Sequence, residues 1–250
     1  MAYNSAHVTS ATDVTVSGLS ISSITGSNGS LASDYTLASN SASVAATIVP
    51  VTLTPTLTDS GVAKTYNGTT AAPTGFTPTY SYSGLISGDT GASLSDTSVV
   101  YNSAHVASAT DVTVSGLSIS SITGSNGSLA SDYSLASHNA NVAATITPAP
   151  LTIGLSNVTD VTKTYDGTTA APSGFSPTYS FVGLVAGDSA TLSSSATPVF
   201  NSPHVASATA ITQGGLSLTS ITGNGSDNSV LGDYTLSNTT ASTGAGVASI

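Results

Sequence analysis

The chain has 250 residues, a formal net charge of −10, and only two basic side chains, Lys64 and Lys163. Phosphate groups and anionic lipid headgroups need Lys or Arg, so this charge balance argues against nucleic acid or a membrane surface as a partner. The chain has no cysteine and no apolar run of about 18 residues, which excludes disulfides, thiolate metal sites and a bilayer-spanning helix.

A long internal repeat dominates the sequence. YNSAHVTSATDVTVSGLSISSITGSNGSLASDYTLAS begins at Tyr3, returns almost unchanged from Tyr101, and returns in a diverged form from Phe200. Between these copies, KTYNGTTAAPTGF from Lys64 matches KTYDGTTAAPSGF from Lys163. The spacing is 98 or 99 residues, so the chain consists of two and a half copies of one unit.

The repeat sets the predicted domain boundaries. We expect the C-terminal half of a unit at 1–49, a complete unit at 50–148 (the first repeat) and another at 149–250 (the second repeat). AATIVPVTLT (45–54) and AATITPAPLT (143–152) contain prolines and are predicted to be extended connectors outside the sheets. The half-unit lacks partner strands, so it is expected to pack on its neighbour or to be poorly held. The polar N-terminus has no signal-peptide pattern, and we expect the chain to be a piece of a longer protein.

Within a unit, alternating apolar and polar residues predict half-buried strands. The clearest examples are PTYSYSGL (78–85), DVTVSGLSI (111–119) and SDYSLAS (131–137), separated by Gly-Asp and Asn-Gly turn signals. Ser, Thr, Val and Gly outnumber the strong helix formers, and glutamate is absent. We therefore predict an all-β chain of tandem immunoglobulin-like β-sandwich repeats, with a β-grasp-like variant carrying a short helix near SLASDY as the alternative.

The aromatic residues recur at equivalent positions in the repeats, as core residues would. The predicted repeat core consists of Tyr66, Tyr80, Tyr101 and Tyr133, with the equivalent Tyr165, Tyr179, Phe200 and Tyr234.

Five motifs in fixed order resemble a known family. KTYDGTTAA (163–171), GLVAGD (183–188), VTVSGLSI (112–119), DYTL (233–236) and ATITPAPLT (144–152) are similar to the YDG repeats, and the related MBG repeats, of very large bacterial surface adhesins. The resemblance covers essentially the whole chain and implies exported, filamentous-haemagglutinin-like proteins with tandem extracellular β-domains. The chain departs from the pattern at Asn67, which replaces the aspartate of YDG, and at the histidine of NSAHV.

The two lysines occupy the same motif, next to a predicted turn at Asn67-Gly68 or Asp166-Gly167. Asn and Asp tolerate a positive φ and glycine prefers it, which explains the exchange of Asn for Asp. The first hypothesis for each lysine is structural, with its stem beside the tyrosine and its ammonium paired with Asp89 or Asp188. An intramolecular isopeptide bond to an Asn or Asp and an interdomain contact are the alternatives.

Other polar residues also recur once per unit. His7, His105 and His204 lie a domain apart, with His138 as an extra, and are predicted to be structural or surface residues. Asp34, Asp132 and Asp233, like Asp89 and Asp188, are predicted to be turn residues, with calcium binding as the alternative. Sequons at Asn28, Asn67, Asn126, Asn157, Asn224 and Asn238 would accept glycans or arise by chance.

No nucleophile elbow, catalytic carboxylate pair or phosphate loop is present in the sequence, so we expect no enzyme activity. Together with the resemblance, this favours structural stalk repeats on the bacterial cell surface that support attachment or a biofilm matrix. The alternative is an adhesive module that binds a glycan or another copy of itself. The expected partners are neighbouring repeats and an unidentified host surface, abiotic surface or matrix.

Overall fold

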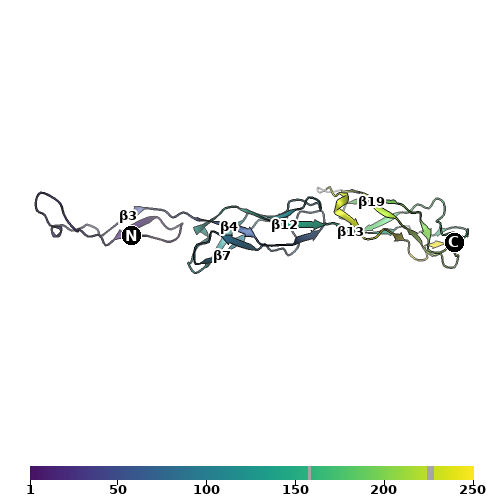
Figure 1. Cartoon of the computed structure of the whole chain (residues 1–250), viewed down its shortest axis with the longest axis horizontal. Helices are drawn as coiled ribbons and strands as arrows, with labels where there is room; N and C mark the ends of the chain where they lie inside the picture. The colour runs from purple at the N-terminus through teal and green to yellow at the C-terminus, as the bar shows by residue number, and fades with distance from the viewer. Residues whose placement is uncertain (157–158, 224–227) are drawn as a thin grey trace. The chain divides into compact units, whose positions relative to one another are not determined.

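The computed structural model describes residues 1–156, 159–223 and 228–250, so the sequons at Asn157 and Asn224 lie outside its description (Figure 1). The described chain is all-β, with 42% strand and 4% helix. It divides into two compact units. Unit 1 comprises 1–58, 78–98 and 114–141, and unit 2 comprises 59–77, 99–113 and 142–250. Among the described residues, no helix is long and apolar enough to cross a membrane.

Unit 1 is built from short strands and two single-turn 3₁₀ helices. These are β1 (Ala2–Tyr3), β2 (Asp13–Ser17), η1 (Ala32–Asp34), β3 (Ser41–Ala45), β4 (Val51–Leu57), β6 (Tyr80–Ser83), β7 (Asp89–Ser95), β10 (Ser118–Gly124), η2 (Ala130–Asp132) and β11 (Tyr133–Leu135). Strands β1, β2 and β3 form an antiparallel sheet in the half-unit. Strand β4 lies between β6, which is antiparallel to it, and β11, which is parallel, while β7 pairs with β10.

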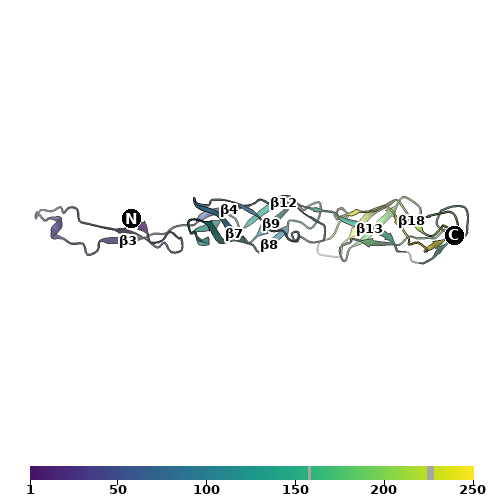
Figure 2. The ribbon, with the colours of Figure 1, turned by 90° about the horizontal axis from the view of Figure 1, so that it is seen from below.

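Unit 2 repeats this pattern. It contains β5 (Val62–Thr65), most of β8 (Ser98–Tyr101), β9 (Asp111–Ser115) and β12 (Asn139–Thr147), then β13 (Ala149–Leu155), β14 (Val161–Thr162), β15 (Tyr179–Val182), β16 (Ser189–Ser194), β17 (Val199–Phe200), β18 (Ile211–Gln213), β19 (Leu216–Thr222), η3 (Leu231–Asp233), β20 (Tyr234–Leu236), β21 (Ala241–Ser242) and β22 (Ala248–Ser249). Strand β13 lies between β15 and β20 just as β4 lies between β6 and β11, and β16 pairs with β19 as β7 does with β10. Figure 2 shows β8, β9 and β12 side by side in the sheet ordered β5-β12-β9-β8.

The prediction of 45–54 and 143–152 as connectors outside the sheets was wrong for most of their length, because 51–54 lies in β4, 143–147 in β12 and 149–152 in β13. Residues 46–50, with Pro50, and the single residue Pro148 do lie between strands. Pro55 lies in β4 and Pro150 in β13, each the middle strand of its sheet. The parallel neighbour of β4 covers only Val51–Leu53, and the antiparallel neighbour of β13 covers only Thr152–Leu155. Each proline therefore has one strand neighbour rather than two, and its missing N–H leaves no ladder bond unmade.

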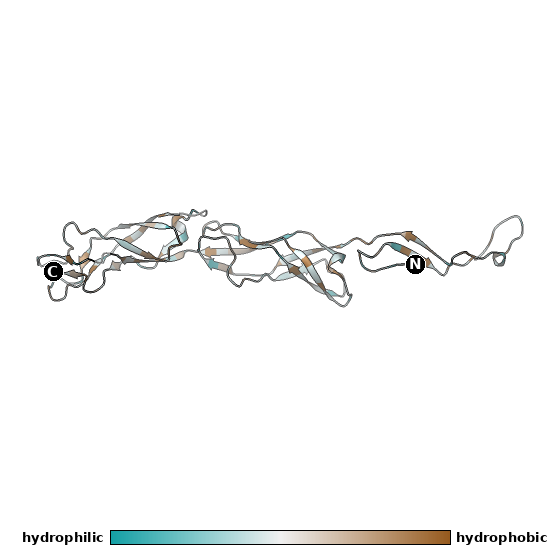
Figure 3. Cartoon of the chain, turned by 180° about the vertical axis from the view of Figure 1, so that it is seen from behind, coloured by the Kyte–Doolittle hydropathy of each residue, from teal (hydrophilic) through white to brown (hydrophobic). Residues whose placement is uncertain are grey.

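The predicted strand 111–119 is two strands that join different sheets. Strand β9 pairs with β8 and β12, whereas β10 pairs with β7. The change occurs at Gly116, where φ is +68° and a Cβ would collide with the side chain of Thr97. Val112 and Val114 of β9 are fully buried, and Figure 3 shows hydrophobic and hydrophilic residues interspersed along the strands.

The aromatic residues divide into buried and exposed sets. Tyr66, Tyr101, Tyr133, Phe200 and Tyr234 are at most 5% exposed, and Tyr80 and Tyr179 are half-buried. Tyr165 is 58% exposed, so its assignment to the core was wrong. In the half-unit, Tyr3 and Tyr35 are 46% and 51% exposed.

Candidate functional site: the lysine clamp and the repeat junction

Lys64 holds the turn that follows it. Its Nζ donates hydrogen bonds to Asn67 Oδ1 at 3.0 Å, to the Thr69 carbonyl at 2.6 Å and to the Ala71 carbonyl at 2.8 Å. It also lies 5.2 Å from the centre of the Tyr101 ring, which adds a cation–π contact. Burial lowers the pKa of Lys64, while the surrounding oxygens favour its protonated form.

Lys163 makes the same clamp in the second repeat. Its Nζ lies 2.7 Å from Asp166 Oδ1 and 2.8 Å from the Thr168 carbonyl, and its side chain is only 7% exposed. The hydrogen bond from Lys163, with two from Thr168, lowers the pKa of Asp166 to about 2. Asn and Asp exchange here because each offers an Oδ1 acceptor to the lysine. The positive φ belongs to the glycines alone, at +74° for Gly68 and +78° for Gly167.

Asp89 and Asp188 bind tyrosines, and the expectation that they pair with the lysines was wrong. The Tyr133 hydroxyl donates to Asp89 Oδ2 at 2.6 Å, and the Tyr234 hydroxyl donates to Asp188 Oδ2 at 2.5 Å. Burial and these carboxylates raise the pKa of Tyr133 and of Tyr234. The lysines satisfy their charge within their own turns instead, because the Asn or Asp of the motif lies three residues away.

In unit 1, the half-unit contacts the first repeat through a histidine and an aspartate. His7 Nδ1 lies 2.8 Å from Asp132 Oδ2, and the Val8 backbone N–H donates to Asp132 Oδ1 at 2.8 Å. The same carboxylate accepts the Leu129 N–H across η2. Burial raises the pKa of Asp132, but hydrogen bonds from Leu129, His7 and Val8 outweigh it, and the pKa is lowered overall.

In unit 2, the two complete repeats meet through equivalent residues. His105 Nδ1 lies 2.8 Å from Asp233 Oδ2, and the Val106 N–H donates to Asp233 Oδ1 at 2.9 Å. Asp233 is fully buried and also accepts the Val230 N–H across η3. The periodic histidine of one repeat therefore pairs with the periodic aspartate of the next. This pairing is the repeat junction.

Tyr66 completes the junction in unit 2. Its ring packs edge-on against Tyr234 with the centroids 5.4 Å apart, and its hydroxyl lies 2.6 Å from Ser229 Oγ. Tyr66 is buried because the second repeat covers it. Tyr165 occupies the equivalent position of the second repeat and has no such cover, which explains its exposure.

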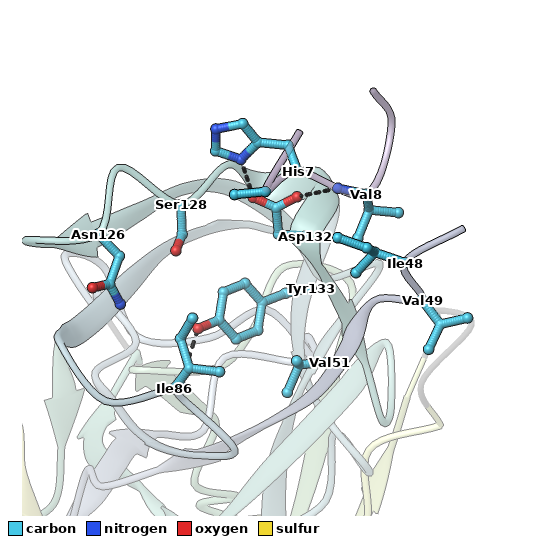
Figure 4. Close-up of a pocket in the computed structure, with 11 residues that line it drawn as sticks. His7, Val8, Ile48, Val49, Val51, Ile86, Asn126, Ser128, Asp132 and Tyr133 are labelled. Atoms are coloured by element: carbon cyan, nitrogen blue, oxygen red, sulfur yellow. Dashed lines mark hydrogen bonds and ion pairs between the residues drawn. The ribbon is translucent and has the colours of Figure 1, made fainter. Parts of the chain in front are cut away.

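Unit 1 has a cavity at the equivalent junction. A space of about 200 Å³ is lined by residues of the half-unit and the first repeat, among them His7, Ile86, Ser128, Asp132 and Tyr133. Figure 4 shows the Tyr133 ring beside this space, with Ser128 and Ile86 on its border and His7 reaching Asp132. Tyr133 and Ser128 correspond in sequence to Tyr234 and Ser229, which hold the Tyr66 ring in unit 2.

The YDG domain model matches residues 49–140 and again 147–243. The chain belongs to the YDG domain family. The two matches cover most of the chain, and they show tandem YDG repeats. No curated protein and no solved structure matched the chain.

The two remaining histidines are the extra His138 in unit 1 and the periodic His204 in unit 2. His138 Nδ1 lies 2.7 Å from the Leu117 carbonyl, in a contact between neighbouring loops. The His204 ring has no hydrogen-bond partner among the described residues and is exposed. Those residues also hold no group of three or more potential metal ligands.

Sequence reasoning found the periodic histidines, aspartates and tyrosines of the junction. It missed the contributions of Val8, Val106 and Ser229, and it missed the pairing between repeats. The signal was present, because NS(A/P)HV and the aspartate of (S/G)DY recur with the same period. A partner in the next repeat has that same period, so periodicity alone does not distinguish a contact within a repeat from one between repeats.

Proposed function

We propose that these YDG repeats are structural stalk segments of a bacterial cell-surface adhesin, where they act outside the cell in attachment or a biofilm matrix. The observation that carries the proposal is the repetition of one junction. Asp132 and Asp233 each receive a histidine ring nitrogen at 2.8 Å and the N–H of the next residue. A junction made by the same residue types at successive repeats suits a long array of domains.

Strand pairing supports a mechanical role. Strand β5 is parallel to β12, and β14 near the start of the second repeat is parallel to β22 at its end. Pulling the two ends of a repeat apart shears parallel neighbours along their length, so their hydrogen bonds are loaded together. For the finer architecture we propose an immunoglobulin-like sandwich, with the 3₁₀ turn η2 near SLASDY supporting a β-grasp-like variant.

Pulling single molecules of the whole chain tests the stalk proposal. Tethering at the two termini should give separate high-force unfolding steps for the two YDG repeats. Replacing Thr145, which pairs with Ala63 in the β5–β12 ladder, by proline should lower the force of one step and leave the other unchanged. Unfolding at low force in both repeats would contradict a mechanical role.

A binding assay tests whether these repeats carry an adhesive site of their own. The whole chain, immobilised, is exposed to glycans and matrix proteins with and without calcium. The stalk proposal expects no saturable binding. Saturable binding of one ligand, abolished by an excess of the same ligand free in solution, would place the adhesive site within these repeats. That result would overturn the purely structural role.

A further inference from the structure

Asn67 and Gly68 place an amide side chain beside a backbone nitrogen that is open to reaction. Glycine has no side chain to shield its nitrogen, and Gly68 has a φ of +74°. Its N–H donates no hydrogen bond to any described residue. The Asn67 side chain is exposed, and every hydrogen bond that the described residues make to it ends on Oδ1. The Nδ2 amine is therefore free to leave.

The donors on Asn67 Oδ1 polarise its side-chain carbonyl. Lys64 Nζ donates to this oxygen at 3.0 Å, and Thr69 donates its N–H at 3.2 Å and its hydroxyl at 3.0 Å. Donors held in this way stabilise negative charge that develops on a carbonyl oxygen, as in an oxyanion hole. One of the three is a cation, so Cγ of Asn67 is activated towards a nucleophile.

The second repeat shows that an aspartate fits the same turn. Asp166 Oδ1 takes the same three hydrogen bonds, from Lys163 Nζ at 2.7 Å and from the N–H and hydroxyl of Thr168, both at 2.9 Å. The Asp166 side chain is 54% exposed. An aspartate at position 67 would keep every contact of the clamp and add an ion pair with Lys64.

We propose that Asn67 is a self-modification site, where the turn converts the asparagine of KTYNG into the aspartate of KTYDG with assistance from Lys64. The conversion goes beyond the stalk role, because it gives the first repeat a chemical change that its gene does not encode. Its product is the charged clamp that the second repeat already has.

The reaction consumes one water and releases one ammonia. The Gly68 nitrogen bonds to Asn67 Cγ and gives its proton to solvent, while the Cγ–Nδ2 bond breaks and Nδ2 leaves as ammonia. Water then adds to Cγ of the resulting succinimide, and the Cγ–N bond breaks to return the nitrogen to the backbone. Nothing is oxidised or reduced. Because the donors lie on Oδ1, they favour attack at Cγ over attack at the backbone carbonyl, which would give isoaspartate.

The chain contains its own comparisons. Other Asn-Gly pairs occur at 28–29, 126–127 and 224–225, the last outside the described residues. Both lysines are bonded within their own turns, so neither polarises Oδ1 of Asn28 or Asn126. Asn126 Nδ2 also donates to the Ser87 carbonyl at 2.8 Å, which restrains the leaving amine. We expect Asn67 to react faster than Asn126, and to give aspartate where the unassisted pairs give mainly isoaspartate.

Peptide mapping by mass spectrometry on the full folded chain, incubated at neutral pH, tests the proposal. Conversion adds about 1 Da to the peptide that contains residue 67, and isoaspartyl methyltransferase labelling separates isoaspartate from aspartate. Removing one donor from an enclosed oxyanion hole costs about 10²–10³ in rate, so Lys64→Met at this partly exposed turn should slow conversion by roughly tenfold. It should also raise the isoaspartate share.

Further variants separate the cation from the shape of the turn. Lys64→Arg keeps a cation and should retain aspartate as the main product, and Thr69→Val should raise the isoaspartate share by removing one donor. Lys163→Met, in the second repeat, is the matched control and should leave position 67 unchanged. Circular dichroism verifies that each variant is folded.

Three results would overturn the proposal. The first is slower conversion at Asn67 than at Asn126, or isoaspartate as its main product. The second is a Lys64→Met chain that reacts as fast as the unmodified chain or faster, because the clamp would then not assist. The third is a loss of about 17 Da that survives mild alkali, which would indicate a cross-link between Lys64 and Asn67. None of these results affects the unfolding-force experiment, so the two proposals fail separately.

Discussion

Replacing Lys64 by methionine removes the ammonium of the clamp and keeps most of the aliphatic stem. Asn67 Oδ1 and the carbonyls of Thr69 and Ala71 then lose their donor. Hydrogen bonds to a charged group contribute about 1.5–3 kcal/mol net, and a cation–π contact at an exposed site adds about 0.5–1 kcal/mol. The burial that lowers the pKa of Lys64 opposes this, because it disfavours the charged form. We expect the turn to be destabilised locally by about 2 kcal/mol.

Hydrogen exchange measures this local effect and has an internal control in the same molecule. By the rule of about 1.4 kcal/mol per tenfold, a loss of 2 kcal/mol should accelerate exchange near residues 62–76 by roughly 30-fold. The equivalent segment 161–175, where Lys163 is intact, should keep its rate. Lys163→Met should give the reverse pattern. Unchanged exchange in 62–76, or equal acceleration in both segments, would refute the clamp as a local device.

Three further predictions follow from named contacts. Because the pKa of Asp166 is lowered, its contribution to stability is present above its unfolded pKa near 3.8 and is lost as the pH falls toward about 2. The NMR amide shift of Thr168, whose N–H donates to Asp166, should therefore titrate in this range. The amide shift of Thr69, whose N–H donates to Asn67, should not change with pH. Gly84→Ala should cost several kcal/mol in urea unfolding, because φ is +95° and the new Cβ would collide with the Thr52 carbonyl, whereas Gly91→Ala in open space should be tolerated within about 1 kcal/mol. Tyr66→Phe should lower the free energy of unfolding by about 1 kcal/mol, whereas the same change at exposed Tyr165 should have no effect.

The sequence was sufficient to predict the all-β class and the tandem repeat, since both depend on local alternation and on self-similarity. It failed where a residue's environment depends on the strand beside it. Pro150 predicts a connector when it is taken alone, and it is accommodated in β13 only because the antiparallel neighbouring strand is short. The division of 111–119 into β9 and β10 likewise depends on the contact between Gly116 and Thr97.

For the candidate site, the sequence identified the polar residues but not their partners. Lys64 and Lys163 were identified by composition alone, but their acceptors lie within three to seven residues rather than at Asp89 or Asp188. Those aspartates bind Tyr133 and Tyr234, 44 and 46 residues away in sequence. Polar residues with the same period have several partners that satisfy the pattern equally, and only packing decides among them.

Tyr66 and Tyr165 show how one repeat sequence serves two environments. Both follow a lysine and precede the Asn-Gly or Asp-Gly turn, yet one is 3% and the other 58% exposed. The lysine clamp forms in both cases, so it does not depend on a following repeat. The clamp therefore fixes the turn in advance, and the tyrosine two residues after the lysine is presented whether or not an acceptor is present. The turn of each repeat is therefore ordered by residues of that repeat alone, whereas the burial of Tyr66 depends on residues of the neighbouring repeat.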